Sequence, residues 1–236
     1  MDQSIILTGD SLLFSSNTST GFMLKMFTSS LWNHSGIAVR INDDGEIVLD
    51  SGGKLYVLEI NTWERTDAIT GKKVLGVGYS DFEWVKKRYN IIVVRAMKEI
   101  YRKDKIINRI DKFVSLYRGY EFTTDIEPFL SVWLGVELME DSGREKSMFC
   151  SEFMSYFYMY ILRMNSVEEV MGPTILLPRL CAPKHFSYEF TPLSPVFVPH
   201  DKIVYIEYCD IGPCLVPILI ITFFVVVIVW MTIPRK

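Results

Sequence analysis

The stretch "SGIAVRINDDGEIVLDSGGKLYVLEI", residues 35–60, decides the fold. It holds three runs rich in valine, isoleucine and leucine, which are separated by an Asp-Gly step and a Gly-Gly step. Such dipeptides supply the positive φ angles that tight hairpin turns need, and the runs between them have the composition of strands. The pattern predicts an antiparallel meander over residues 35–60.

Apolar residues recur at strand-like or helical spacing on both sides of this meander. They predict strands near residues 4–14, 90–97 and 202–208, and helices within residues 15–30, 82–89, 104–119 and 149–164. We expect residues 66–81 to form a loop and the proline-rich residues 172–200 to be extended. Together these elements predict an α+β fold, with an antiparallel sheet packed against helices, across residues 1–205.

Residues 211–233 contain no charged side chain. A helix of about 20 apolar residues can cross the hydrocarbon core of a bilayer, so the stretch predicts one transmembrane helix within a C-terminal anchor at residues 206–236. No signal peptide is expected, because Asp10 falls inside what would be its apolar core. We therefore expect a single-pass tail anchor in a lipid bilayer, with the preceding domain on the cytosolic side.

The charge balance and the cysteine pattern argue against several classes of protein. A formal net charge of -3 provides no excess of Lys and Arg for phosphate contacts, so we expect no nucleic-acid partner. The cysteines form no C-x-x-C pair, and no ligands have the spacing of a structural zinc site, so we expect no metal. A Gly-x-Gly-x-x-Gly loop is also missing from the sequence, and we expect no cofactor.

Cys150 lies at the start of the helix predicted near residues 149–164, in the stretch "SMFCSEFMSYF". Unpaired N–H groups and the macrodipole at a helix start stabilise negative charge, which lowers the pKa of a thiol and makes it a better nucleophile. A lone cysteine is more often packed as a small apolar residue. From this residue alone both interpretations stay open.

His34 precedes the meander in a polar Asn-His-Ser context and is followed by Gly36, so its ring need not be buried in the core. A neutral imidazole can accept a thiol proton, and an acceptor on its far side would fix its tautomer. Asp50 is the candidate for that acceptor, because a hairpin brings the ends of the first two runs together. Glu59 on the third run competes for the role, and either carboxylate could instead be solvated.

Several segments of the chain carry a family resemblance when they are taken in order. They are "LTGDSLLF" (7–14), "WNHSGIAV" (32–39), "IVLDSGG" (47–53), residues 74–97, "YRGYEF" (117–122) and "FCSEFMSYFYMYI" (149–161). They resemble the circularly permuted branch of the NlpC-type papain-like superfamily, which poxviruses, other large DNA viruses and bacteria carry, and to which lecithin retinol acyltransferase is distantly related. The likeness covers about residues 5–190.

The resemblance implies a permuted papain-like fold with a thiol active site. In that branch a His-x-Gly strand supplies the base, a polar residue on the following strand orients it, and Cys-Ser-Glu begins the nucleophile helix. By position these roles fall to His34, Asp50 and Cys150. Relatives often carry Glu where this chain has Asp50.

The sequence and the resemblance together predict a membrane-anchored cysteine hydrolase or acyltransferase of a large DNA virus. Its substrate would be an amide, ester or thioester of a lipid acyl group or a peptide. The alternative is a non-catalytic membrane or virion protein that keeps the papain-like fold as a binding module. Catalysis requires Cys150 and His34 to lie within hydrogen-bond reach, whereas a binding module does not.

Overall fold

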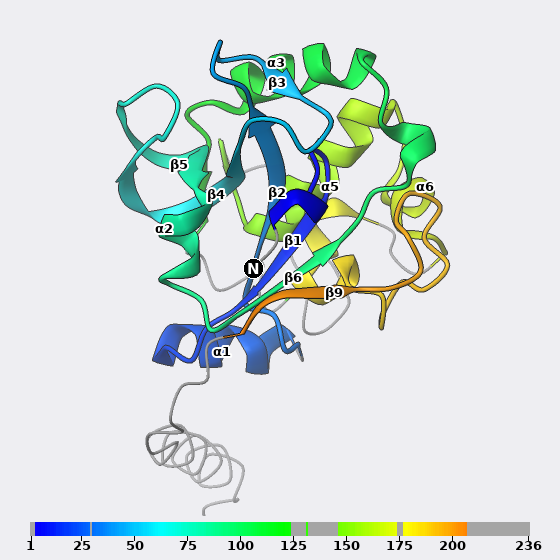
Figure 1. Ribbon diagram of the computed structural model, residues 1–236. Coiled ribbons are helices and arrows are strands. Elements are labelled where there is room, and N and C mark those ends of the chain that lie inside the picture. The colour runs from blue at the N-terminus through cyan, green and yellow to red at the C-terminus, as the bar shows by residue number, and fades with distance from the viewer. Residues whose placement is uncertain (1–2, 29, 124–130, 132–145, 174–176, 207–236) are drawn as a thin grey trace, which may run out of the picture.

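One antiparallel sheet organises the chain (Figure 1). The computed structural model describes residues 3–28, 30–123, 131, 146–173 and 177–206. Within these residues the sheet has seven strands in the order β5-β4-β2-β1-β6-β9, with β3 also paired to β2. The strands are β1 (Ser11–Ser15), β2 (His34–Ile41), β3 (Ile47–Val48), β4 (Lys54–Thr66), β5 (Lys73–Asp81), β6 (Ile91–Arg95) and β9 (Lys202–Ile206). A separate parallel pair joins β7 (Glu121–Phe122) to β8 (Ser147–Met148).

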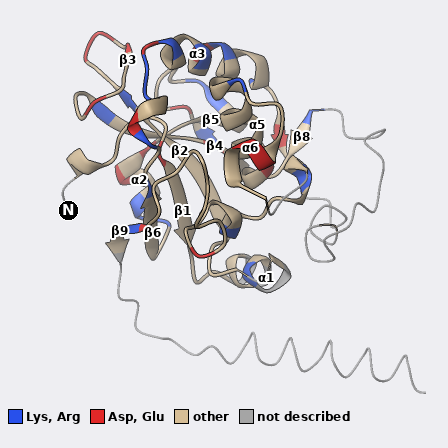
Figure 2. Cartoon of the chain, turned by 90° about the vertical axis from the view of Figure 1, so that its right-hand side faces the viewer, with Lys and Arg blue, Asp and Glu red and all other residues tan. Residues whose placement is uncertain are grey.

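Helices cover both faces of this sheet. They are α1 (Ser19–Thr28), α2 (Phe82–Lys86), α3 (Lys105–Tyr117), α5 (Cys150–Leu162) and α6 (Val167–Met171). Alternate residues of a strand point to opposite faces, so Ile37 and Leu58 share one core with α3 and α5, whereas Ala38 and Val57 share a second core with α2. Figure 2 shows charged residues of both signs on α3, whose apolar side is buried.

These elements confirm the predicted α+β class and the antiparallel sheet packed against helices. The four helices predicted within residues 15–30, 82–89, 104–119 and 149–164 are present, and the strands near residues 4–14, 90–97 and 202–208 correspond to β1, β6 and β9. No helix among the described residues is long and apolar enough to cross a membrane. The span expected at residues 211–233 lies outside the described residues.

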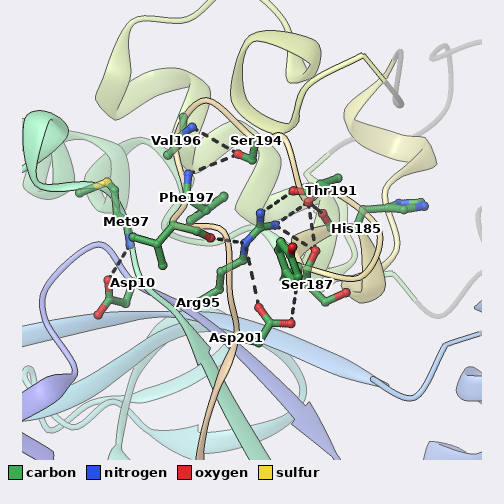
Figure 3. A network of polar contacts seen from close by, with 12 residues as sticks. Asp10, Arg95, Met97, His185, Ser187, Thr191, Ser194, Val196, Phe197 and Asp201 are labelled. Atoms are coloured by element: carbon green, nitrogen blue, oxygen red, sulfur yellow. Dashed lines mark hydrogen bonds and ion pairs between the residues drawn. The ribbon is translucent and has the colours of Figure 1, made fainter.

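Arg95, at the end of β6, fixes the proline-rich segment that precedes β9 (Figure 3). Its buried guanidinium donates hydrogen bonds to the carbonyl oxygens of Ser187 and Val198 at 2.9 and 3.3 Å and to Thr191. The carboxylate of Asp201 lies 4.0 Å from Arg95 Nε. Because the buried charge is both paired and hydrogen-bonded, it can hold a segment with little regular structure against the sheet.

The Gly-Asp step before β1 also has a structural role. Asp10 accepts hydrogen bonds from the N–H groups of Leu7 and Met97, each at 2.8 Å, and forms an ion pair with Arg102. The side chain therefore joins the turn before β1 to the residues after β6. Asp10 belongs to residues 7–14, one of the segments that resemble the permuted papain-like branch.

The predicted meander is only partly correct. β3 has just two residues, and β4 pairs directly with β2 in a register that sets Ile37 opposite Leu58. Arg40 explains part of the difference, because it donates to the carbonyl oxygens of Ser51 and Gly53 at 3.1 and 2.9 Å. These carbonyls bond to a side chain instead of to a neighbouring strand, so the second run cannot extend the ladder.

The loop prediction for residues 66–81 is correct only for residues 67–72, because β5 occupies Lys73–Asp81. Its glycines suggest a loop, yet they serve close packing. Gly76 has a φ of +85°, and a Cβ at this position would overlap the carbonyl oxygen of Tyr120. The glycine therefore allows β5 to lie directly against the chain that enters β7.

Replacing Gly76 by alanine tests this packing against a matched control. Gly45 has nearly the same φ, +83°, but no atom lies within 4 Å of its Cβ position. Gly76→Ala should lower the free energy of unfolding by about 3 kcal/mol, and Gly45→Ala by only about 1 kcal/mol. Urea unfolding followed by tryptophan fluorescence measures both. Equal losses would contradict the close approach of β5 to Tyr120.

Candidate active site

Helix α5 presents Cys150 as its first residue. The preceding Phe149 is extended, with φ −100° and ψ 169°, so the helix begins at the cysteine itself. Phe153 and Phe157, one and two turns further along, are fully buried in the core and anchor the helix. Cys150 is 4% exposed, and its sulfur is therefore held in a fixed position near the surface of the core.

His34 is the first residue of β2, and its ring forms a hydrogen bond with the thiol of Cys150. The backbone N–H of the neighbouring Ser35 also contacts the sulfur. The start of β2 thus meets the start of α5, and helix α5 packs across β2 to keep them together. Two of the predicted site residues, Cys150 and His34, are therefore neighbours.

Glu59 binds the far side of the imidazole. His34 Nε2 lies 2.8 Å from Glu59 Oε2, which leaves Nδ1 for the sulfur. Continuing the register that pairs Ile37 with Leu58 sets Glu59 opposite Gly36. Since residues two apart share a face of the strand, the missing side chain of Gly36 leaves room for the carboxylate to reach the ring.

Two aromatic rings pack against the imidazole. Phe14 and Tyr89 stack on His34 with ring centroids 5.6 and 5.7 Å away. All three residues are buried. Because apolar surroundings lower the local dielectric, they strengthen the contacts that His34 makes with the sulfur and with the carboxylate.

The buried carboxylate of Glu59 has a full set of partners. Ser80 Oγ donates to Oε1 at 2.5 Å, and Arg65 Nε lies 4.0 Å from the same oxygen while donating to Ser80 Oγ at 2.9 Å. Burial alone would raise the pKa of Glu59, but the hydrogen bond and charge of His34 and the charge of Arg65 outweigh it and lower the pKa. The residue is therefore a carboxylate, and it can orient and stabilise an imidazolium.

The same contacts shift the proton from sulfur to imidazole. Burial lowers the pKa of His34, but Cys150 and Glu59 outweigh this effect and raise it to about 9. Burial raises the pKa of the Cys150 thiol, but the charge and hydrogen bond of His34 outweigh it and hold the pKa below its usual value. Both shifts favour a thiolate beside an imidazolium, the form in which a cysteine is nucleophilic.

Two cavities lead to this pair. A narrow one of about 20 Å³, enough for one water molecule, reaches Cys150 between Trp32 and Phe149. A larger one of about 580 Å³ reaches His34. Both are lined in part by Asn33, so the thiol and the imidazole are approached from one side of the molecule.

Asp50 does not take part in this site. It lies in an exposed bend after β3, and its Oδ1 accepts a hydrogen bond from the N–H of Gly52 at 2.9 Å. The bend is near the Ile41 end of β2, whereas His34 is at the opposite end, roughly 20 Å away at the usual rise of a strand. The assignment of Asp50 as the orienting residue is corrected to Glu59, the competing candidate.

The sequence pattern does not indicate a role for Ser80, Arg65 or Tyr89. Ser80 lies in the stretch that was expected to be a loop, and Arg65 follows an irregularity in the pairing of β4 with β5, so no strand pattern placed either near Glu59. Among the described residues, no group of three or more His, Cys, Asp or Glu side chains is arranged to hold a metal ion.

Comparisons with known proteins find similarity among solved structures. No family model matches the sequence, and a search of curated proteins also finds no match. Among solved structures, the crystal structure of the metalloprotein YiiX from Escherichia coli O157:H7 is similar with a TM-score of 0.44 and 17% sequence identity, over 86% of this chain and 99% of that chain. The chemistry of the site therefore rests on its own geometry.

The pH dependence of thiol reactivity tests the role of Glu59. Between the lowered pKa of Cys150 and the pKa of His34 near 9, alkylation by iodoacetamide should be fast and nearly constant, and it should fall at lower pH as the thiolate is protonated. Glu59→Gln removes the charge that stabilises the imidazolium, so the acidic limb should move up by about one pH unit. Asp50→Asn is the control and should leave the profile unchanged. Equal shifts in both variants would contradict the assignment.

Proposed function

We propose that this chain is a thiol hydrolase or acyltransferase with a permuted papain-like active site. The observation that carries the proposal is the buried series of contacts from Cys150 through His34 to Glu59. A thiol at a helix start, an imidazole and an orienting carboxylate are the groups that nucleophilic acyl transfer needs. The sequence resemblance supports the proposal independently, because the permuted branch also places histidine before cysteine.

In the first half of the reaction the thiolate of Cys150 attacks the carbonyl carbon of an amide, ester or thioester. A carbon–sulfur bond forms, and the negative charge passes to the carbonyl oxygen. N–H groups in the first turn of α5 have no acceptor within the helix, so they can stabilise that oxyanion. As the bond to the leaving group breaks, His34 gives its proton to the departing nitrogen, oxygen or sulfur, and an acyl-enzyme remains.

In the second half a nucleophile releases the acyl group. His34, now neutral, takes a proton from water or from an alcohol or amine, which attacks the thioester carbon. The carbon–sulfur bond breaks, and the thiolate of Cys150 is restored beside the protonated imidazole. Attack by water makes the protein a hydrolase, and attack by an alcohol or amine makes it an acyltransferase.

The proposal includes a tether to a membrane. The uncharged residues 211–233 would anchor the domain to a lipid bilayer, with the site on the cytosolic side. Such a tether favours lipid acyl groups and membrane-associated peptides as substrates. If the chain comes from a large DNA virus, as the resemblance suggests, the membrane could be that of the virion.

Labelling with a thiol-reactive probe distinguishes this proposal from a non-catalytic binding module. Cys181 is an internal control, because burial raises its pKa to about 12. A haloacetamide probe should label Cys150 much more than Cys181, and His34→Ala should reduce the labelling of Cys150 by about a hundredfold, as measured by peptide mass spectrometry. Equal labelling of the two cysteines would favour the binding module.

Turnover gives the complementary test. An untargeted screen of lipids and peptides should find products with the wild-type chain that are missing with Cys150→Ala. Cys181→Ser should keep that activity, because Cys181 makes no contact with His34 among the described residues. Products that form equally with Cys150→Ala would contradict the proposed nucleophile.

A further inference from the structure

The larger cavity beside His34 has a mostly apolar lining that also carries several side chains able to donate hydrogen bonds. They are the side chains of Ser16, Thr18, Asn61, Thr62, Trp63, Lys87 and Arg88. No Asp or Glu is among the described residues that line it. At about 580 Å³ the cavity is large enough for a small organic group.

Two of these donors are buried without an acceptor. Asn61 is 2% exposed, and within the described part of the chain neither its Nδ2 nor Nε1 of Trp63 has a hydrogen-bond partner. Both residues lie on β4, two and four positions after Glu59, and the register continued from Ile37 and Leu58 sets Asn61 opposite His34. Since unpaired buried donors destabilise a protein, their presence beside the imidazole points to a ligand that accepts from them.

Positive charge at the mouth of the cavity is held in place. The Arg88 guanidinium lies 3.9 Å from the ring centroid of Trp84 and 5.1 Å from that of Trp63, so two indoles position it. Neither Lys87 nor Arg88 forms an ion pair with another described residue. The carboxylate of Glu59 is already engaged on both oxygens, so it does not neutralise these cations.

We propose that this cavity binds an anionic group of the substrate, a carboxylate or a phosphate, close to the acyl bond that Cys150 attacks. Asn61 and Trp63 donate to the anion from the wall of the cavity, and Arg88 and Lys87 neutralise it at the mouth. As a statement about substrate class the inference rests on the proposed function, but the binding of the anion itself does not depend on a reactive thiol.

Binding measurements on the full-length Cys150→Ala chain in a neutral detergent test the inference without turnover. Calorimetry would compare N-hexanoyl-glutamate with N-hexanoyl-glutamine, and dihexanoyl phosphatidic acid with dihexanoylglycerol. Each pair differs in one anionic group, so the two arms distinguish a carboxylate from a phosphate. In at least one arm the anionic member should bind about tenfold more tightly, and Arg88→Gln should remove most of that preference.

Further variants separate charge from folding. Arg88→Lys keeps the charge and should retain most of the preference, and Lys112→Gln, on the exposed side of α3, should retain all of it. Equal binding of both members in both arms would overturn the inference, and so would a preference that Arg88→Gln leaves intact. Either result would contradict the anion site without contradicting the reactivity of Cys150. A failure of thiol labelling would contradict the proposed function without contradicting the anion site.

Discussion

The buried hydrogen bond between His34 and Glu59 is the interaction on which the site depends. A carboxylate that is removed from water without partners costs several kcal/mol and becomes protonated. Here Ser80, Arg65 and the imidazole share its charge, so it stays ionised. That charge in turn favours an imidazolium, and the imidazolium favours a thiolate on Cys150. The carboxylate of Glu59, the imidazolium of His34 and the thiolate of Cys150 therefore stabilise one another in the core.

The fold brings Cys150 and His34 together because each is the first residue of a helix or strand. β2 begins at His34, and α5 begins at Cys150, so both side chains lie at the ends of buried elements. Gly36 lets β4 bring its carboxylate against the ring. The same strand then carries Asn61 and Trp63 into the larger cavity. One strand thus orients the base and lines the space where we propose that the substrate binds.

Local pattern predicted the α+β class and most of the elements, and it indicated Cys150 and His34 as separate candidates, because each of these depends on residues close together in the sequence. Their shared role was implied by the family resemblance. The choice between Asp50 and Glu59 could not be made from local pattern. It depends on which run approaches the His34 end of β2. β3 pairs only with Arg40 and Ile41 at the other end, whereas the register of β4 continues toward His34. β5 was not predicted because Gly76 is typical of a loop, and its packing against Tyr120 is a contact that the sequence does not indicate. Ser80 lies on β5 and was therefore not predicted either.

The central claim is that the imidazole of His34 and the sulfur of Cys150 stabilise each other's charge. Nitrogen NMR of the His34 ring in the full-length chain measures this directly, since it follows the proton on each ring nitrogen as the pH changes. The account predicts that the native ring loses its second proton near pH 9 and that the Cys150→Ala ring loses it at a clearly lower pH. A ring that titrates at the same pH in both proteins would contradict the account.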